Sequence, residues 1–153
     1  MGEEVLSRRG GTQLVVDVFV EGELYVRLAG DGVVVATALG SSAYTMAAGG
    51  PLLQAGVNAF VCTPLAMHGG NAPPIVIPFD RELSLELHPG HTGFDLQVDG
   101  FDVPTAELHL AIKSERSYAT LADVDHFGRG LDGLRARGLI SDSPRLLAGG
   151  NQR

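Results

Sequence analysis

The chain has 153 residues and a formal net charge of −7, and 44% of its residues are hydrophobic while 19% are charged. These values indicate one globular domain with a hydrophobic core and exclude a disordered chain, and the acidic balance argues against nucleic acid as a partner, because a nucleic-acid binder needs a basic surface. Since Cys62 is the single cysteine and no apolar stretch reaches membrane-spanning length, we expect a cytoplasmic protein with neither an internal disulfide nor a membrane anchor.

β-Strands dominate the elements that the sequence predicts. Residues 13–20 and 23–28 are apolar-rich runs on either side of Glu21-Gly22, a pair typical of a hairpin turn. Several later runs alternate apolar and polar residues with the period of two that a half-buried strand requires. Turn residues recur every ten to twenty positions, so the pattern favours a mainly β protein, an antiparallel β-sandwich, over an alternating βαβ fold. The other expected strands cover residues 33–37, 57–63, 75–77, 83–87, 94–98 and 108–112.

A short helix is expected after the strand that ends at Thr37. A turn at Gly40 leads into residues 41–48, and the Gly-Gly-Pro that follows is a strong helix stop. The hydroxyl of Ser41 or Ser42 is the expected N-cap. Such a helix start presents free N–H groups and the positive end of the helix dipole, which suits an anionic or polar ligand. The residues alone leave a purely structural strand–turn–helix open.

The C-terminal part predicts a weak helix followed by a flexible tail. Phe127, Leu131 and Leu134 recur at helical spacing within residues 126–139, but the glycines in this stretch weaken the helix. Residues 141–153 are expected as the tail.

The stretch DGVVVATALGSSAYTMAAGGPLL, residues 31–53, resembles the DG…STPTGSTAYSLSAGGP signature of the C-terminal domain of the NAD kinase family. The likeness continues through FVCTPLAMHGGNAPPIVIP at residues 60–78, and it includes EEVLSRRG at residues 3–10 and QVDG at residues 97–100. It covers roughly residues 3–140. The resemblance implies that residues 1–140 form an antiparallel β-sandwich of that domain type, with one short helix after the GSSAY turn and a weak C-terminal helix.

The resemblance also implies a substrate-binding site, which would take NAD or a related adenine nucleotide. The family's position that meets the ligand across a subunit boundary falls on Ala66, so a homo-oligomer is expected. The chain departs from the family pattern at Glu3, Ala29, Ala47 and Phe101, which puts contacts with the ligand phosphates in doubt. The expected site residues are Glu4, Asp31, Ser42, Ala43, Tyr44 and Ala66.

The family's catalytic part lies in a separate N-terminal domain with a GGDGT loop, and this sequence contains no such motif. The one GDG, at residues 30–32, matches the family's binding aspartate instead. The resemblance implies an intact enzyme that phosphorylates NAD to NADP with ATP or polyphosphate and Mg²⁺. We therefore expect an NAD-binding domain that is not catalytic by itself and works with a catalytic domain, on this or a separate chain. The alternatives are a stand-alone nucleotide-binding regulatory protein and a structural assembly protein.

Neither catalytic residues nor metal ligands are expected in this chain. His88, His91 and Asp95 flank a Pro-Gly turn and could be imagined as three ligands, but we do not expect them to bind a metal. The group Asp123, Asp125 and His126 precedes the weak helix and is expected to supply cap and turn residues.

Overall fold

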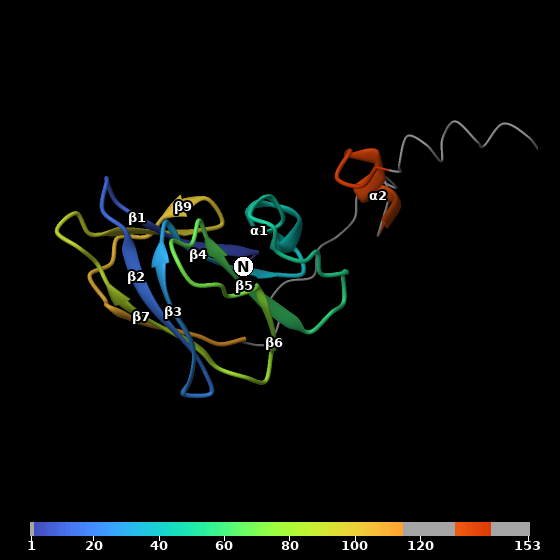
Figure 1. Ribbon diagram of the computed structural model, residues 1–153. Helices are drawn as coiled ribbons and strands as arrows, with labels where there is room; N and C mark the ends of the chain where they lie inside the picture. Colours follow the sequence, from blue (N-terminus) through green and yellow to red (C-terminus); the bar gives the residue numbers. More distant parts are fainter. Residues whose placement is uncertain (1, 115–130, 142–153) are drawn as a thin grey trace, which may run out of the picture. The chain divides into compact units, whose positions relative to one another are not determined.

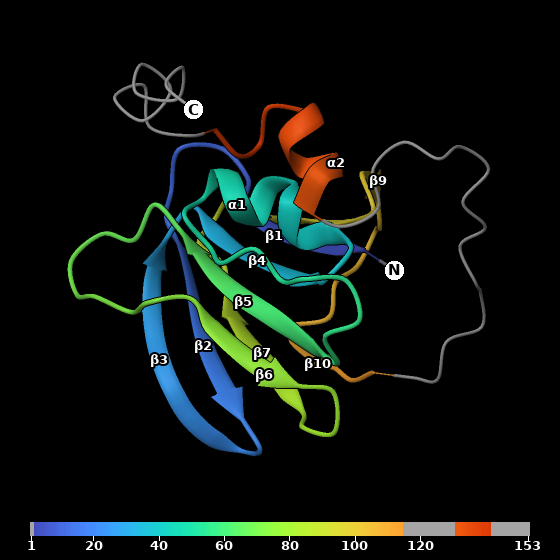
Figure 2. The ribbon, with the colours of Figure 1, turned by 90° about the vertical axis from the view of Figure 1, so that its right-hand side faces the viewer.

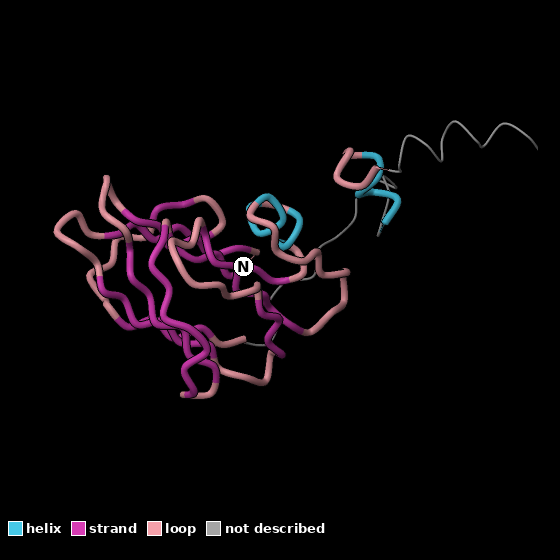
Figure 3. The backbone as a smooth tube through the Cα atoms, viewed as in Figure 1, coloured by secondary structure: helices cyan, strands magenta, loops and turns pink. Residues whose placement is uncertain are grey.

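A computed structural model describes residues 2–114 and 131–141, and the chain divides into two compact units, residues 1–116 and residues 117–153. The first unit consists of two antiparallel sheets (Figure 1). One sheet runs in the order β6 (Ile75–Pro78), β5 (Ala59–Leu65), β4 (Gly32–Thr37), β1 (Glu3–Arg8), β8 (Phe94–Val98) and β9 (Phe101–Asp102). The other runs β10 (His109–Ile112), β7 (Leu83–His88), β2 (Leu14–Val20) and β3 (Glu23–Gly30). This confirms the predicted mainly β, antiparallel architecture, and strands dominate the backbone trace (Figure 3).

The hairpin between β2 and β3 forms as the sequence predicts. Glu21 and Gly22 connect the strands with φ angles of 53° and 77°, the positive values that a tight hairpin turn requires. The strand β1 is a new element, because its mixed polar and apolar residues carry little strand signal. It pairs with β4 on one side and β8 on the other, so the N-terminal segment lies in the middle of its sheet.

The core lies between the two sheets. Alternate residues of β4 and β5 point inward, and these meet the alternate residues of β2 and β7. Cys62 belongs to this core, as expected, and its burial raises the pKa of the thiol to about 12. The buried residues of the core are Leu6, Leu14, Val16, Val18, Leu28, Val33, Val35, Phe60, Cys62, Ile77, Leu83, Leu85, Leu87 and Phe94.

The six-stranded sheet is also covered on its other face. Val34 and Ala36 alternate with the inward residues of β4 and are nevertheless almost fully buried. The helix α1 (Tyr44–Ala47) lies over this face, above β1 and β4 (Figure 2). The two-sided burial explains why β4 is a continuous apolar run.

The predicted helix over residues 41–48 is shorter and in two pieces. A 3-10 helix covers Gly40–Ser42, Ala43 separates the pieces, and α1 covers four residues. The expected end holds, since Gly49 follows with φ 83°.

The helix α2 (Leu131–Ala136) lies within the expected weak C-terminal helix, and Gly138 follows it with φ 72°. Residues 126–130 of that prediction, with Phe127, and residues 142–153 of the expected tail lie outside the described residues. In the described part of the chain, no helix combines the length and apolar character needed to cross a bilayer.

Candidate functional site

The turn after β4 is held by the side chain of Ser41, which is fully buried. Its Oγ donates to the carbonyl of Ala38 at 2.9 Å and accepts from the amide of Leu53 at 2.9 Å. The predicted N-cap is therefore wrong. Ala43 occupies the N-cap position of α1 and forms no side-chain cap, because Ser41 is used to join the two ends of the loop.

The first amides of α1 are bound by Glu3, a residue of another strand. Thr45 N–H donates to Glu3 Oε1 at 2.9 Å, and Tyr44 N–H donates to Oε2 at 3.4 Å. Glu3 reaches them because it lies opposite Ala36 in the β1–β4 ladder, directly under the helix. A carboxylate at a helix start is favoured by the N–H groups and by the helix dipole. The N–H groups that the sequence suggested for an anionic ligand thus already bind an anion of the protein itself.

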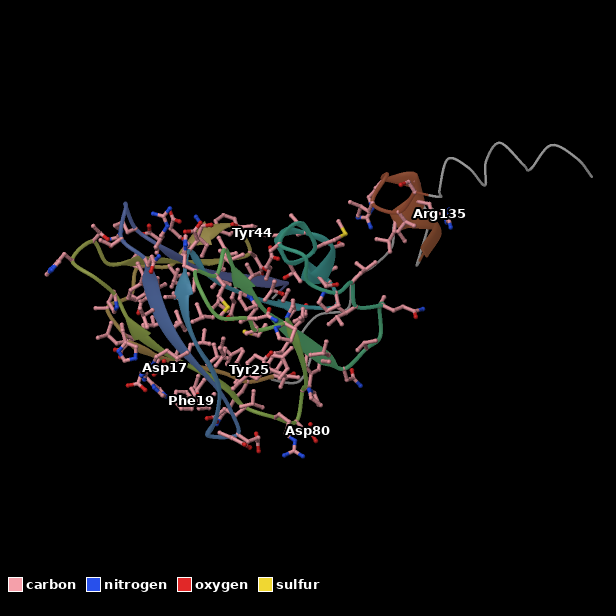
Figure 4. The ribbon with its side chains drawn as sticks, in the orientation of Figure 1. Asp17, Phe19, Tyr25, Tyr44, Asp80 and Arg135 are labelled. Carbon is pink, nitrogen blue, oxygen red and sulfur yellow. The ribbon has the colours of Figure 1, made fainter. Side chains whose placement is uncertain are left out.

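Three of the predicted site residues surround this helix start. Ser42 is half-buried, Ala43 is exposed, and the side chain of Tyr44 is 46% exposed. Figure 4 shows Tyr44 at α1, of which it is the first residue, on the side of the sandwich away from Asp17. An exposed aromatic ring on a fixed backbone can stack on a planar ligand group and use its hydroxyl as a hydrogen-bond partner.

Glu4 does not share this face. It pairs with Val35 on β4 and with Val98 on β8, and strand alternation places it on the core side of the sheet, opposite to Glu3. Burial raises the pKa of the Glu4 carboxyl, and the nearby charge of Asp99 raises it further. Glu4 is therefore the sequence neighbour of Glu3, which binds the helix start, but it faces the other side of the sheet.

Asp31 and Ala66 are brought together in a second group. The amide of Asp31 donates to the carbonyl of Leu65 at 2.9 Å, which joins the start of β4 to the end of β5. Ala66 has φ 43°, an uncommon value for a residue with a side chain, and turns the chain sharply there. A Cβ at Gly30 would lie 2.6 Å from the Leu65 carbonyl oxygen and 2.9 Å from that of Ala66, so this close approach needs glycine.

The carboxylate of Asp31 is paired with Arg8. Arg8 Nε donates to Asp31 Oδ1 at 2.5 Å, and its Nη1 donates to the carbonyl of Gly10. Both side chains are partly exposed, 34% for Arg8 and 41% for Asp31. The pair leaves part of the aspartate surface open to a ligand.

The two groups lie toward opposite ends of β4. Asp31 precedes the first residue of this strand, and Ser42, Ala43 and Tyr44 follow its last. The six residues of β4 extend over about 17 Å at the usual rise of a strand. Apart from Glu4, the predicted site residues therefore form two separate groups within one copy of the chain.

The side chains of His88, His91 and Asp95, considered above as possible metal ligands, do not come together in the fold. Within residues 2–114 and 131–141, possible ligand atoms come within 4.8 Å of one another in one other trio, Asp17, Glu86 and His88. Arg27 forks onto both oxygens of Asp17, with Nε 2.6 Å from Oδ1, and this hydrogen bonding lowers the pKa of the aspartate. Arg27 supplies the positive charge that a metal would supply, so a salt-bridge cluster accounts for the trio. The second group, Asp123, Asp125 and His126, lies outside the described residues.

Sequence reasoning missed the roles of Glu3 and Arg8. Glu3 lies 42 residues before Thr45 and Arg8 lies 23 residues before Asp31. Neither separation matches a helix or hairpin spacing, so no local pattern in the chain pointed to these contacts.

The sequence and the fold of this chain are both similar to those of known proteins. The chain matches the family described as the ATP-NAD kinase C-terminal domain over residues 2–121. It is 26% identical over 129 residues to an NAD kinase of Cytophaga hutchinsonii, and the aligned residues make up 83% of this chain and 44% of that protein. It is 33% identical over 100 residues to an NAD kinase of Flavobacterium psychrophilum, and the aligned residues make up 65% of this chain and 34% of that protein. The chain thus spans less than half the length of these curated relatives.

Two solved structures share the fold. An NAD kinase from Archaeoglobus fulgidus in complex with ATP superposes with a TM-score of 0.67 at 25% identity, over 75% of this chain and 45% of that one. Yeast NADH kinase complexed with NADH gives a TM-score of 0.71 at 23% identity, over 99% of this chain and 42% of that one. The second likeness concerns the fold alone.

Proposed function

The chain belongs to the family of the ATP-NAD kinase C-terminal domain, and on that premise we propose that it binds NAD, or a related adenine nucleotide, as the dinucleotide-binding domain of an NAD kinase. The observation that carries the proposal is the Tyr44 turn. A half-exposed ring stands there on a backbone that Ser41 and Glu3 hold from two sides. Rigid support of an aromatic side chain lowers the entropy lost when a ligand binds.

Each group of residues has a distinct part in the proposed binding. Tyr44 stacks on a planar ring of the nucleotide, with Ala43 leaving room beside it and Ser42 offering a hydroxyl. Asp31 accepts a hydrogen bond from an amide or amino group of the ligand, an interaction with a charged group that is worth about 1.5–3 kcal/mol. Ala66, which turns the chain next to Asp31, presents a small side chain that lets the ligand approach closely.

We further propose that a second copy of the chain completes the site. The Tyr44 group and the Asp31–Ala66 group lie toward opposite ends of β4, so two copies can bring one group of each against the same ligand. A two-fold arrangement would form two equivalent sites in this way, because each copy then offers both groups to its neighbour.

Phosphoryl transfer is proposed to depend on residues beyond those described here. The reaction needs a positioned triphosphate or polyphosphate, Mg²⁺ and an oriented hydroxyl. The residues around Tyr44 do not fit a metal site, since the described trio of possible ligands lies on β2 and β7 of the other sheet and is paired with Arg27.

Calorimetric titration of the purified chain with NAD tests the proposal. We expect saturable binding that Tyr44→Ala and Asp31→Asn each weaken by about tenfold. Val76→Ala, at an exposed position on the edge strand β6, serves as a matched control that keeps the parent affinity. If the parent chain shows no binding at millimolar NAD, the proposed function is wrong and the structural assembly alternative stands.

A further inference from the structure

We propose that residues 44–50, which comprise α1 and the turn after it, form a lid on the six-stranded sheet that opens without the rest of the protein unfolding. In the seated state, which the structure shows, the lid covers the side chains of Thr45 and Thr63. In the lifted state the hydroxyls of these two residues reach water. The lid is a property of the fold and does not depend on nucleotide binding.

Two threonine hydroxyls lie unpaired between α1 and the sheet. Thr45 is on α1, and Thr63 is on β5, where it pairs with Val34 of β4; both threonines are fully buried. Among the buried side-chain polar atoms of residues 2–114 and 131–141, their Oγ1 atoms are the two that form no hydrogen bond. A buried hydroxyl without a partner has lost its hydrogen bonds to water and gained none in exchange. The seated state is therefore disfavoured by both side chains.

The backbone of Gly50 is what covers the Thr63 hydroxyl. A Cβ built on Gly50 would lie 2.5 Å from Thr63 Oγ1, 2.7 Å from Thr45 Cγ2 and 2.9 Å from the Thr45 carbonyl oxygen. Carbon atoms that are not bonded to these groups do not approach them so closely, so the chain can cross Thr63 at this height only with glycine. Raising the turn at Gly50 removes this cover and gives the hydroxyl access to solvent.

Few hydrogen bonds hold the lid to the sheet. Within the described residues, the bonds that join residues 44–50 to a strand are those from the amides of Tyr44 and Thr45 to the carboxylate of Glu3. The bonds at the end of α1 close within the lid itself, because Ala48 N–H donates to the Tyr44 carbonyl and Gly50 N–H donates to that of Thr45, both at 2.8 Å. A four-residue helix is not stable without packing. Opening the lid therefore breaks far fewer contacts than global unfolding does.

Native-state hydrogen exchange of the full chain, followed by NMR at low urea concentrations, tests whether the lid opens alone. The reporters are the amides of Ala48 and Gly50, which are hydrogen-bonded only while α1 and its turn are intact. We expect them to exchange faster than the amides of β5 beneath them. Their exchange should also depend little on urea, because a local opening exposes little surface, whereas exchange in β5 should accelerate with urea.

Thr63→Val tests whether the unpaired hydroxyl favours opening. Valine has nearly the shape of threonine but no hydroxyl, so the variant removes the unpaired group and keeps the packing. We expect exchange at Ala48 and Gly50 to slow by about five- to a hundredfold, since a buried hydroxyl without a partner gives up its full hydration in the seated state. Thr45→Val should act in the same direction. Thr63→Ser is the matched control, because it keeps the hydroxyl and loses only the methyl group, and it should not slow the exchange.

Two results would overturn the lid. If Ala48 and Gly50 in the parent chain exchange as slowly as the amides of β5 and with the same urea dependence, residues 44–50 open only when the whole protein unfolds. If Thr63→Val leaves their exchange unchanged or accelerates it, the Thr63 hydroxyl does not disfavour the seated state. Both measurements are made without a nucleotide, so a chain that fails to bind NAD would refute the proposed function and leave the lid standing.

Discussion

Arg8 Nε donates to Oδ1 of Asp31 across 2.5 Å, and this contact joins the end of β1 to the turn that precedes β4. The pair lies on the same side of the molecule as the turn at Ala66, since the amide of Asp31 also binds the carbonyl of Leu65. The aspartate that the family resemblance assigns to ligand binding is thus oriented by a residue from the N-terminal strand.

Replacing Arg8 separates binding from stability. Both side chains of the pair are about one-third or more exposed, so Arg8→Ala should cost at most about 1 kcal/mol of unfolding free energy. NAD affinity should fall several-fold, because Asp31 loses the partner that orients it. Urea unfolding and calorimetric titration measure the two effects. A variant with full affinity would show that Arg8 has no part in positioning Asp31.

The close approach at Gly30 predicts a stability effect with a matched control. Gly30→Ala places a methyl group 2.6 Å and 2.9 Å from two backbone oxygens of residues 65 and 66, which have little freedom to move. We expect a loss of about 1–3 kcal/mol in unfolding free energy. Gly11→Ala, where nothing lies within 4 Å of the added Cβ, should change stability little. Equal stabilities in urea unfolding would contradict the described β4–β5 connection.

Mixing two variants that each bind NAD weakly tests whether a second copy completes the site. Tyr44→Ala and Asp31→Asn each damage one of the two groups and should each bind NAD poorly. If two copies share the site, a mixed dimer regenerates one intact site from the undamaged groups, and roughly a quarter of all sites should bind again after equal mixing and re-equilibration. The measurement is the number of binding sites in calorimetry, with each variant alone as the control. No recovery would mean that each copy holds both groups along its own β4.

The turn at Asp99 predicts a dependence of stability on pH. Hydrogen bonds from the backbone N–H of Glu3, and then of Gly2, lower the pKa of Asp99, so its contribution is present above the pKa of an unfolded aspartate, about 3.9. That contribution is lost as the pH falls through the lower folded pKa. Asp99→Asn tolerates the φ of 50° at this position and removes the titration. The parent should therefore be more stable than the variant at pH 6, and the difference should shrink toward pH 2. A constant difference in thermal unfolding across this range would exclude the linkage.

The strands of this protein could be predicted from the sequence because their signals are local. The hairpin of β2 and β3 has its turn residues between two apolar runs, and alternation marks β7 and β8 without reference to a partner. The strand β1 was missed, since Glu3–Arg8 mixes charged and apolar residues and is paired on both sides only in the folded sheet. The Gly-Gly-Pro stop predicts the helix after β4. The predicted serine N-cap is wrong, because the first amides of the helix bind Glu3 instead.

The sequence by itself determined the mainly β, antiparallel class, the core position of Cys62 and the short helix after Thr37, because strand periodicity, burial of apolar residues and glycine stops act over a few neighbouring positions. The tertiary structure alone decided that Glu3 caps α1, that Arg8 holds Asp31, and that the candidate residues form two groups toward opposite ends of β4. These contacts depend on the register of β1 against β4, which places side chains together that are 23 and 42 residues apart. Register is a property of the assembled sheet, since a shift of one residue would turn Glu3 to the core side and bring Glu4 under the helix.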